Sequence, residues 1–158
     1  MPLIHQIFIA PTAAAPMQSL KTAMVTTHGL AGDRYALRKD LSSGQRHELR
    51  DVTLISLDDI QESNSTLEVP FTPAEIRRNI VIAGKISLLD FVGRELTIGT
   101  VRLRGIEEAA PCRRPERLAK KPGFRKAFEH RAGIRAKVLQ TGQISVGDEV
   151  TLTTPALP

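Results

Sequence analysis

The chain has 158 residues, of which 41% are hydrophobic and 25% are charged, and it carries a formal net charge of +5. This composition is typical of one folded domain spanning residues 1–158, and it excludes an intrinsically disordered chain. A single cysteine excludes a disulfide within the chain, so nothing points to an oxidising compartment.

The N-terminus does not resemble a targeting segment. Residues 1–10 have no basic region, and their apolar stretch is interrupted by His5 and Gln6. No run approaches the roughly 20 apolar residues that a membrane helix needs. We therefore expect a cytoplasmic protein that has no membrane partner.

Short strands dominate the predicted elements, and turns marked by glycine separate them. The run at 52–57 is apolar and rich in β-branched residues, which is typical of a strand buried on both faces. The last strands are expected to form a hairpin-like pair about Thr141 and Gly142. Strands are predicted at residues 4–9, 52–57, 79–82, 94–99, 101–106, 134–140 and 143–152.

Helix signals occur at two places in the middle of the chain. A short helix is expected to begin at Asp58 or Asp59 and to run through Ser63, because an acidic residue suits both the N-cap and the helix dipole. Residues 72–75 (TPAE) combine an N-cap residue, proline at the first helical position and glutamate at the third. This second helix is predicted to continue into residues 76–78.

Residues 113–133 carry the last helical signals. Phe124, Ala127 and Phe128 fall on one helix face, and Gly133 is placed as a C-cap. Many short strands without regular alternation of strand and helix favour a mainly β fold. We predict a closed or nearly closed β-barrel decorated by a few short helices.

Basic residues gather between Arg102 and Lys137. This bias favours a small anionic ligand such as a phosphate-bearing cofactor, a nucleic acid, or a solvated helix face without a ligand. Stacking platforms for single-stranded nucleic acid use aromatic side chains, and the chain has only five Phe, one Tyr and no Trp. Nucleic acid is therefore not the expected partner. A non-catalytic basic module for an anionic partner is kept as the alternative function.

The only cysteine, Cys112, lies between two prolines in residues 109–116 (AAPCRRPE), and two arginines follow it directly. Nearby cations favour the thiolate, which is the nucleophile and the metal ligand. The prolines restrict the backbone, so we expect a stiff loop rather than a helix or strand. The other interpretation is a small buried hydrophobic side chain beside a surface pair of arginines.

Two further clusters are candidate anion sites. In residues 28–35 the glycines permit close backbone approach to a ligand, and Arg34 adds a guanidinium. The alternative is a surface turn in which Asp33 and Arg34 pair with each other. Residues 77–79 (RRN) end a predicted helix, where they could line an anion pocket or complete the helix dipole.

The histidines His5, His28, His47 and His130 show no metal-ligand spacing, and no second cysteine completes a zinc site. A nucleophilic pair of Cys112 with a histidine stays open, because such partners are adjacent in space rather than in sequence. The glycine patterns of nucleotide-binding loops are absent.

Five blocks taken together resemble the MOSC domain, which is the C-terminal domain of molybdenum cofactor sulfurases and also occurs as a stand-alone protein. They follow one another in the expected order and cover residues from about 5 to 152. The blocks are residues 29–35 (GLAGDRY), 52–56 (VTLIS), 77–80 (RRNI), 111–113 (PCR) and 133–150, which contains GIRA, GQI and GDEV.

The resemblance implies a stand-alone MOSC protein with a β-rich barrel and a pocket for the pterin-based molybdenum cofactor (molybdopterin). The family's single cysteine maps to Cys112. It would ligate molybdenum in a reductase of N-hydroxylated compounds, or accept sulfur as a persulfide in sulfur transfer, and either role needs a thiolate. A cysteine desulfurase or a redox protein would be the partner, beside a small-molecule substrate. The residues implied to bind the cofactor are Gly32, Asp33, Arg34, Arg77, Arg78, Asn79 and Arg113.

Two departures limit this transfer. The chain has neither the aminotransferase-like half of the sulfurases, which carries pyridoxal phosphate, nor the additional N-terminal barrel of the longer reductases. Pyridoxal phosphate therefore enters only through family association, since no lysine lies in a supporting motif. Tyr35 stands where many relatives have histidine, which puts in doubt any step that this histidine assists.

Overall fold

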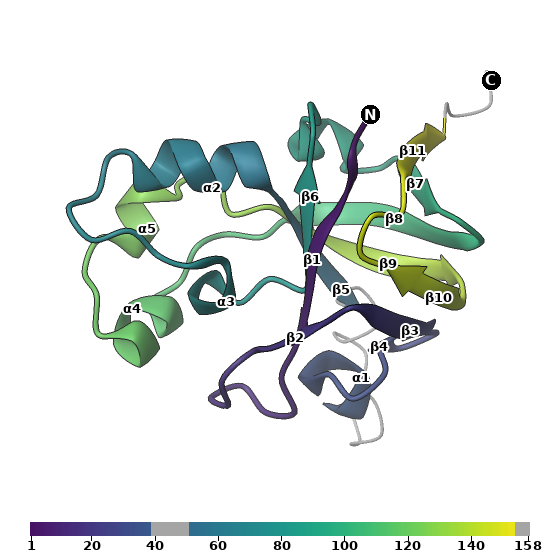
Figure 1. Cartoon of the computed structure of the whole chain (residues 1–158), viewed down its shortest axis with the longest axis horizontal. Helices are drawn as coiled ribbons and strands as arrows, with labels where there is room; N and C mark the ends of the chain where they lie inside the picture. The colour runs from purple at the N-terminus through teal and green to yellow at the C-terminus, as the bar shows by residue number, and fades with distance from the viewer. Residues whose placement is uncertain (39–50, 154–158) are drawn as a thin grey trace.

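The computed structural model describes residues 1–38 and 51–153. Within these ranges the chain is mainly β, with strands at one end and most helices gathered at the other (Figure 1). The predicted fold class, mainly β with a few short helices, is therefore confirmed. The helices are α1 (Arg34–Arg38), α2 (Leu57–Asn64), α3 (Pro73–Ile76), the 3-10 helix η2 (Leu88–Phe91), α4 (Arg114–Ala119) and α5 (Phe124–Ala127).

Eight strands form the larger sheet, in the order β11-β7-β8-β9-β5-β6-β1-β2. Its neighbouring strands are antiparallel except β5 and β6, which run parallel. Parallel neighbours need a crossover connection, and the segment carrying α2 and α3 supplies it. The strands are β1 (Leu3–Ile9), β2 (Gln18–Leu20), β5 (Val52–Ser56), β6 (Ile80–Ala83), β7 (Glu95–Ile98), β8 (Val101–Glu108), β9 (Ile134–Gln140) and β11 (Val150–Thr153).

A smaller sheet consists of β10 (Gly142–Ser145), β3 (Thr22–Thr26) and β4 (Gly29–Leu30). Because β10 pairs with β3 and not with β9, the predicted hairpin about Thr141 and Gly142 is wrong. The chain changes sheet at this point. Local turn residues cannot reveal that change, because it depends on which distant strand is available for pairing.

The predicted closure into a barrel is not confirmed, because neither sheet closes on itself among the described strands. The terminal strands of the larger sheet, β11 and β2, do not pair with each other. Contact between β1 and the start of β11 is limited to an isolated bridge of Leu3 with Glu149 and a few hydrogen bonds, such as Ile4 N–H to the Asp148 carbonyl at 2.9 Å.

Two hydrophobic clusters lie on opposite faces of the larger sheet. In β5, Leu54 belongs to the cluster that also contains side chains of the smaller sheet, and its neighbour Ile55 belongs to the cluster under the helices. This explains why the whole run of β5 is buried, as predicted. The helix-side cluster holds Phe71, Phe124 and Phe128, with the last two rings stacked at a centroid distance of 4.6 Å.

The predicted start of α3 is confirmed in its details. The Thr72 hydroxyl accepts a hydrogen bond from the Glu75 N–H at 3.3 Å, and the Glu75 carboxylate accepts one from the Thr72 N–H at 2.9 Å. The helix ends earlier than predicted, at Ile76, because Arg77 adopts a left-handed conformation with φ 69°. That turn directs the following residues into β6.

Two other predicted helix boundaries are wrong. The N-cap of α2 is Ser56, whose hydroxyl accepts from the Asp59 N–H at 3.1 Å, so the helix begins at Leu57. Gly133 is not a helix C-cap, because α5 ends at Ala127 and its C-cap is Phe128. Its φ of +89° instead lets β9 begin against β5, where an added Cβ would lie 1.8 Å from the Leu54 carbonyl oxygen.

Several short elements have no counterpart in the prediction, namely β2, β3, β4, α1 and η2. The strands among them have at most five residues, too few for a clear periodic pattern. His47 lies outside the described residues.

Candidate functional site

Cys112 lies exposed on the surface, in the segment that joins β8 to α4. It belongs to neither a helix nor a strand, as predicted. The alternative interpretation, a small buried hydrophobic side chain, is wrong. Helix α4 begins two residues later at Arg114, with Pro115 in its first turn.

Arg78 holds the backbone that leads to Cys112. Its side chain is buried, the Nε–H donates to the Ala132 carbonyl at 2.7 Å, and Nη2 donates to the Ala109 carbonyl at 3.1 Å. Among the described residues no carboxylate pairs with this guanidinium. A buried cation is thus used to tie the start of the cysteine segment to the loop before β9.

Arg77, its neighbour, points to the other side and holds the loop that follows β1. It is 6% exposed, and its Nη1 and Nη2 groups donate to the carbonyls of Ala15 at 2.6 Å and Ala13 at 2.9 Å. Backbone carbonyls satisfy these donors without neutralising the charge. The left-handed turn at Arg77 explains why two consecutive arginines reach different segments.

Asp33 and Arg34 form a buried ion pair at 3.0 Å. The pairing foreseen for a turn is present, but the pair is buried rather than on the surface. Asp33 also accepts from the Ala10 N–H at 3.0 Å. Arg34 continues the network, because its Nη2 donates to the Arg77 carbonyl at 3.2 Å and its guanidinium lies 4.4 Å from the centre of the Tyr35 ring.

Asn79 is fully buried directly before β6, and its side chain contacts two strands, β5 and β1. Its side-chain oxygen accepts from the Thr53 N–H at 3.0 Å, and its side-chain NH₂ donates to the Phe8 carbonyl at 3.1 Å. These hydrogen bonds give Asn79 a structural role in the fold. Its predicted contact with a cofactor stays a prediction.

Arginines from separate parts of the sequence lie close enough to act on one another's charge. Burial lowers the pKa of Arg77, and the positive charges of Arg34 and Arg114 lower it further. We call Arg34, Arg77, Arg78 and Arg114 the arginine cluster.

Burial and neighbouring groups also act on the pKa of Arg78. Burial lowers its pKa to about 10, while the ionisable groups of Tyr35 and Cys112 act in the opposite direction. The guanidinium is therefore charged at neutral pH. Tyr35 and Cys112 are close enough to Arg78 to act on its charge.

The remaining predicted site residues lie at the margin. Gly32 is exposed with φ +84°, and Arg113 is exposed at the N-cap of α4, where its side chain makes no capping hydrogen bond. Arg114, rather than Arg113, is the residue of this pair whose charge acts on Arg77. The sequence analysis did not select Arg114, for which adjacency to Arg113 was the only signal. It named Tyr35 only because this residue stands where many relatives have histidine.

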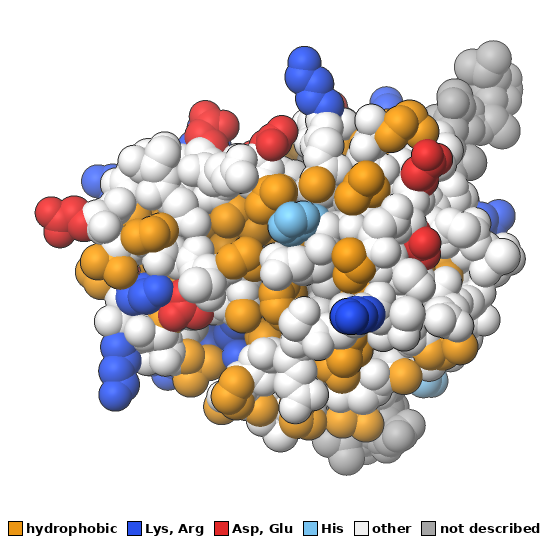
Figure 2. All heavy atoms as spheres, in the orientation of Figure 1, with side chains coloured by type: hydrophobic (Ala, Val, Ile, Leu, Met, Phe, Trp, Pro, Cys, Tyr) orange, Lys and Arg blue, Asp and Glu red, His pale blue; other side chains and the backbone are white. Residues whose placement is uncertain are grey.

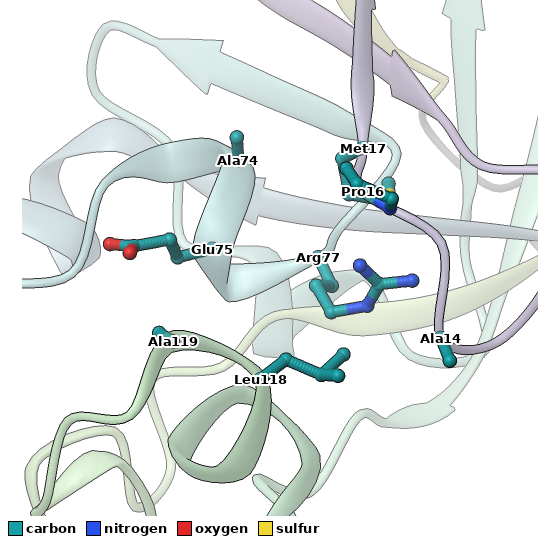
Figure 3. A pocket seen from close by; sticks show the side chains of 8 residues that line it. All are labelled: Ala14, Pro16, Met17, Ala74, Glu75, Arg77, Leu118 and Ala119. Carbon is teal, nitrogen blue, oxygen red and sulfur yellow. The ribbon is translucent and has the colours of Figure 1, made fainter.

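A pocket of about 240 Å³ opens beside Arg77, between the loop after β1, α3 and α4 (Figure 3). Its wall is mainly apolar, and its two charged side chains are Arg77 and Glu75. The Glu75 carboxylate points away from the Arg77 guanidinium and pairs with Lys121 at 2.6 Å. Arg77 is therefore the cation available at this pocket. The lining residues are Ala14, Pro16, Met17, Ala74, Glu75, Arg77, Leu118 and Ala119.

Over residues 1–38 and 51–153, no group of three or more His, Cys, Asp and Glu side chains is arranged to hold a metal ion. No helix in the same ranges is long and apolar enough to span a membrane.

Fold and site define a class: a small, mainly β domain in which one exposed thiol lies near buried arginines with few carboxylates. The family model of the MOSC domain matches residues 42–151, which is more than half of the chain. The chain belongs to the MOSC domain family, which is known to bind the molybdenum cofactor.

Solved structures share this fold at low sequence identity. The YuaD protein from Bacillus subtilis is similar with a TM-score of 0.80 and 19% identity, covering 95% of this chain and 94% of that chain. YiiM from Geobacillus stearothermophilus is similar with a TM-score of 0.74 and 17% identity, covering 98% and 76%. YiiM from Escherichia coli is similar with a TM-score of 0.70 and 13% identity, covering 98% and 71%. No curated protein matches the chain.

Proposed function

We propose that this chain binds the pterin-based molybdenum cofactor through the arginine cluster, and that Cys112 contacts the cofactor as a molybdenum ligand or as a sulfur acceptor. The observation that carries the proposal is one exposed thiol on the segment whose start is hydrogen-bonded to the buried Arg78, with buried Arg34 and Arg77 from other parts of the chain in the same cluster.

The charge of the site fits an anionic group. The arginine cluster has four positive charges, and Asp33 is the one carboxylate paired with it among the described residues, which leaves a net +3. A phosphate carries up to two negative charges, so its binding would relieve repulsion between the arginines. Arg77 lines the pocket beside α4, so its positive charge is the one that a phosphate in this pocket would meet, while its Nη groups stay bonded to backbone carbonyls.

The few metal-binding side chains also fit a metal that is already bound by an organic cofactor. The described residues offer no cluster of three protein ligands, and Cys112 would contribute one thiolate. A soft thiolate suits a transition metal, and one protein ligand suffices when an organic chelate supplies the others.

Two reactions would suit this arrangement. When bound, the cofactor would supply two-electron redox chemistry at molybdenum. With two electrons from a redox protein and two protons, it would support cleavage of the N–O bond of an N-hydroxylated compound, with the oxygen leaving as water. In sulfur transfer, the Cys112 thiolate attacks the sulfane sulfur of a donor persulfide, and the donor thiolate leaves. In both cases Arg78 holds the backbone that leads to Cys112, through hydrogen bonds to the Ala132 and Ala109 carbonyls.

The test is metal and pterin analysis of protein purified from a host that makes the cofactor. Wild type is compared with Cys112→Ser and with Arg104→Gln, a surface control. We expect wild type to contain molybdenum and pterin in equal amounts, and the control to contain as much of each as wild type. Wild type without either one would contradict the proposal.

The same proteins separate the two roles of the thiol. If Cys112 is a molybdenum ligand, Cys112→Ser loses molybdenum or changes its X-ray absorption spectrum at the sulfur shell. If it is a sulfur acceptor, Cys112→Ser keeps both components, and only wild type gains a persulfide, detected by intact mass, after incubation with a cysteine desulfurase and cysteine.

A further inference from the structure

The positive charge of this chain is concentrated in one short segment. Residues 113–126 contain seven basic residues and one acidic residue, a net charge of +6. The whole chain carries +5, so the other residues together carry a net charge of −1. This segment begins directly after Cys112.

The segment presents its charge to solvent. Lys121 is partly buried against Glu75, but six other basic side chains are exposed and form no ion pair with any described residue. At the end of the molecule where Figure 1 places α4, Figure 2 shows several Lys and Arg side chains, with acidic side chains among them. We call these six residues the basic face: Arg113, Arg114, Arg117, Lys120, Arg125 and Lys126.

We propose that the basic face docks an acidic protein, whose Asp and Glu side chains contact α4 and α5 and bring its surface next to Cys112. A helix face that is solvated without a partner usually alternates charges of both signs, whereas residues 113–126 contain one acidic residue, Glu116, whose carboxylate is bound to the Arg125 N–H at 2.9 Å. Glu108 and Glu129 line a surface hollow beside Arg125 and Lys126, so the positive charge dominates at α4 and is partly balanced at that edge. A face of one sign attracts a partner of the opposite sign and orients it before contact.

An acidic protein fits this face better than a nucleic acid does. Single-stranded nucleic acid needs aromatic side chains on which bases stack, and the two aromatic residues of this region, Phe124 and Phe128, are buried in the core. The face is also small, since α4 and α5 have six and four residues. Transient complexes that deliver electrons bury small interfaces of this kind.

Docking beside Cys112 would let the acidic protein deliver electrons or sulfur to the site, and this part of the inference rests on the proposed function. Reduction of a substrate and transfer of sulfur both need a second protein that supplies electrons or sulfane sulfur. Docking itself needs no cofactor, so it can be measured separately from cofactor binding.

The experiment measures binding of a fluorescently labelled poly-glutamate peptide by anisotropy, with two triple variants that remove the same charge. Arg117→Gln/Lys120→Gln/Lys126→Gln changes the basic face and leaves the arginine cluster intact. Lys85→Gln/Arg94→Gln/Arg104→Gln changes three exposed basic residues elsewhere. A second readout is the rate at which a bulky maleimide alkylates Cys112 with and without the peptide, at one fixed pH.

We expect the basic-face variant to bind about tenfold more weakly than wild type, since three exposed charge contacts are lost. The control variant should differ by less than about twofold, and the peptide should slow alkylation of Cys112. Equal weakening in both variants would overturn the inference, because binding would then follow net charge alone. Unchanged alkylation would overturn the placement beside Cys112.

Two further probes test the class of partner. A DNA duplex and vesicles containing phosphatidylserine are measured at the same salt concentration as the peptide. If either binds more tightly than poly-glutamate and is weakened in the same way by the basic-face variant, the inference of an acidic protein is wrong.

Discussion

Replacement of Arg78 by methionine tests whether a buried guanidinium holds the segment that carries Cys112. The substitution keeps an unbranched, largely apolar side chain of similar length but removes the donors to the carbonyls of Ala132, at 2.7 Å, and Ala109, at 3.1 Å. Both bonds have short, favourable distances. The third contact, to the Ala110 carbonyl at 3.5 Å, is too long to add much.

The expected magnitude follows from these contacts. A hydrogen bond from a charged donor contributes about 1.5–3 kcal/mol. Two are lost, and their acceptors stay buried. Removal of a buried charge without a carboxylate partner returns part of the desolvation cost. We therefore expect Arg78→Met to lower the free energy of unfolding by about 3 kcal/mol. This corresponds to a fall of about 10 °C in the melting temperature for a chain of this size.

Thermal and urea unfolding measure the loss, with Arg113→Met as the control because Arg113 is exposed and should change stability by less than about 0.5 kcal/mol. Arg78→Lys keeps the charge but not the two-pronged donor, so we expect an intermediate loss. Hydrogen exchange adds a local readout: the Ala109 amide, bonded to the Gly133 carbonyl at 2.9 Å, should exchange faster in Arg78→Met. A melting temperature equal to that of wild type would refute the reasoning.

Two other predictions concern the fold around the site. Gly133→Ala should lower the free energy of unfolding by more than about 3 kcal/mol, because its Cβ would lie 1.8 Å from the Leu54 oxygen at a φ of +89°. Gly93→Ala, at φ +85° with no atom within 4 Å, should cost about 1 kcal/mol, and equal losses in urea titration would count against this account. Burial raises the pKa of Glu75, but hydrogen bonds from Lys121 and a backbone N–H outweigh it, so the pKa lies below the ordinary 4.5. A carboxylate with a lowered folded pKa stabilises the fold above its unfolded pKa, and this contribution is lost as the pH falls through the folded value. The stability difference between wild type and Glu75→Gln should thus shrink as the pH falls below 4.5, and a difference that is constant with pH would contradict the ion pair.

Local patterns predicted those elements whose causes lie within a few residues. The capping box at Thr72 is a contact between neighbours in sequence, so it could be recognised before the structure was known. The buried strand at residues 52–56 followed from its apolar composition. The start of α2 was misplaced because Ser56, the last residue of β5, also caps the helix, and a residue that serves two elements carries no separate signal.

Pairing between distant strands could not be predicted in the same way. The choice of β3 as the partner of β10 depends on which sheet edge is free after the rest of the chain has folded. Whether the larger sheet closes depends on pairing between strands from opposite ends of the chain, and only an isolated bridge of Leu3 with Glu149 forms there. Neither property leaves a periodic pattern in either strand.

The sequence by itself determined the mainly β class, the family resemblance that the comparison confirmed, and the position of one thiol followed by a basic segment. These features can be read from the sequence, because strand periodicity, family blocks and local charge each depend on residues that are close together along the chain. The tertiary structure alone decided that Arg77 and Arg78 turn to opposite sides, and that the charge of Arg114 rather than that of Arg113 acts on Arg77. The reason is that a guanidinium reaches whichever carbonyls the fold brings within about 3 Å, and those belong to loops more than thirty residues away along the chain.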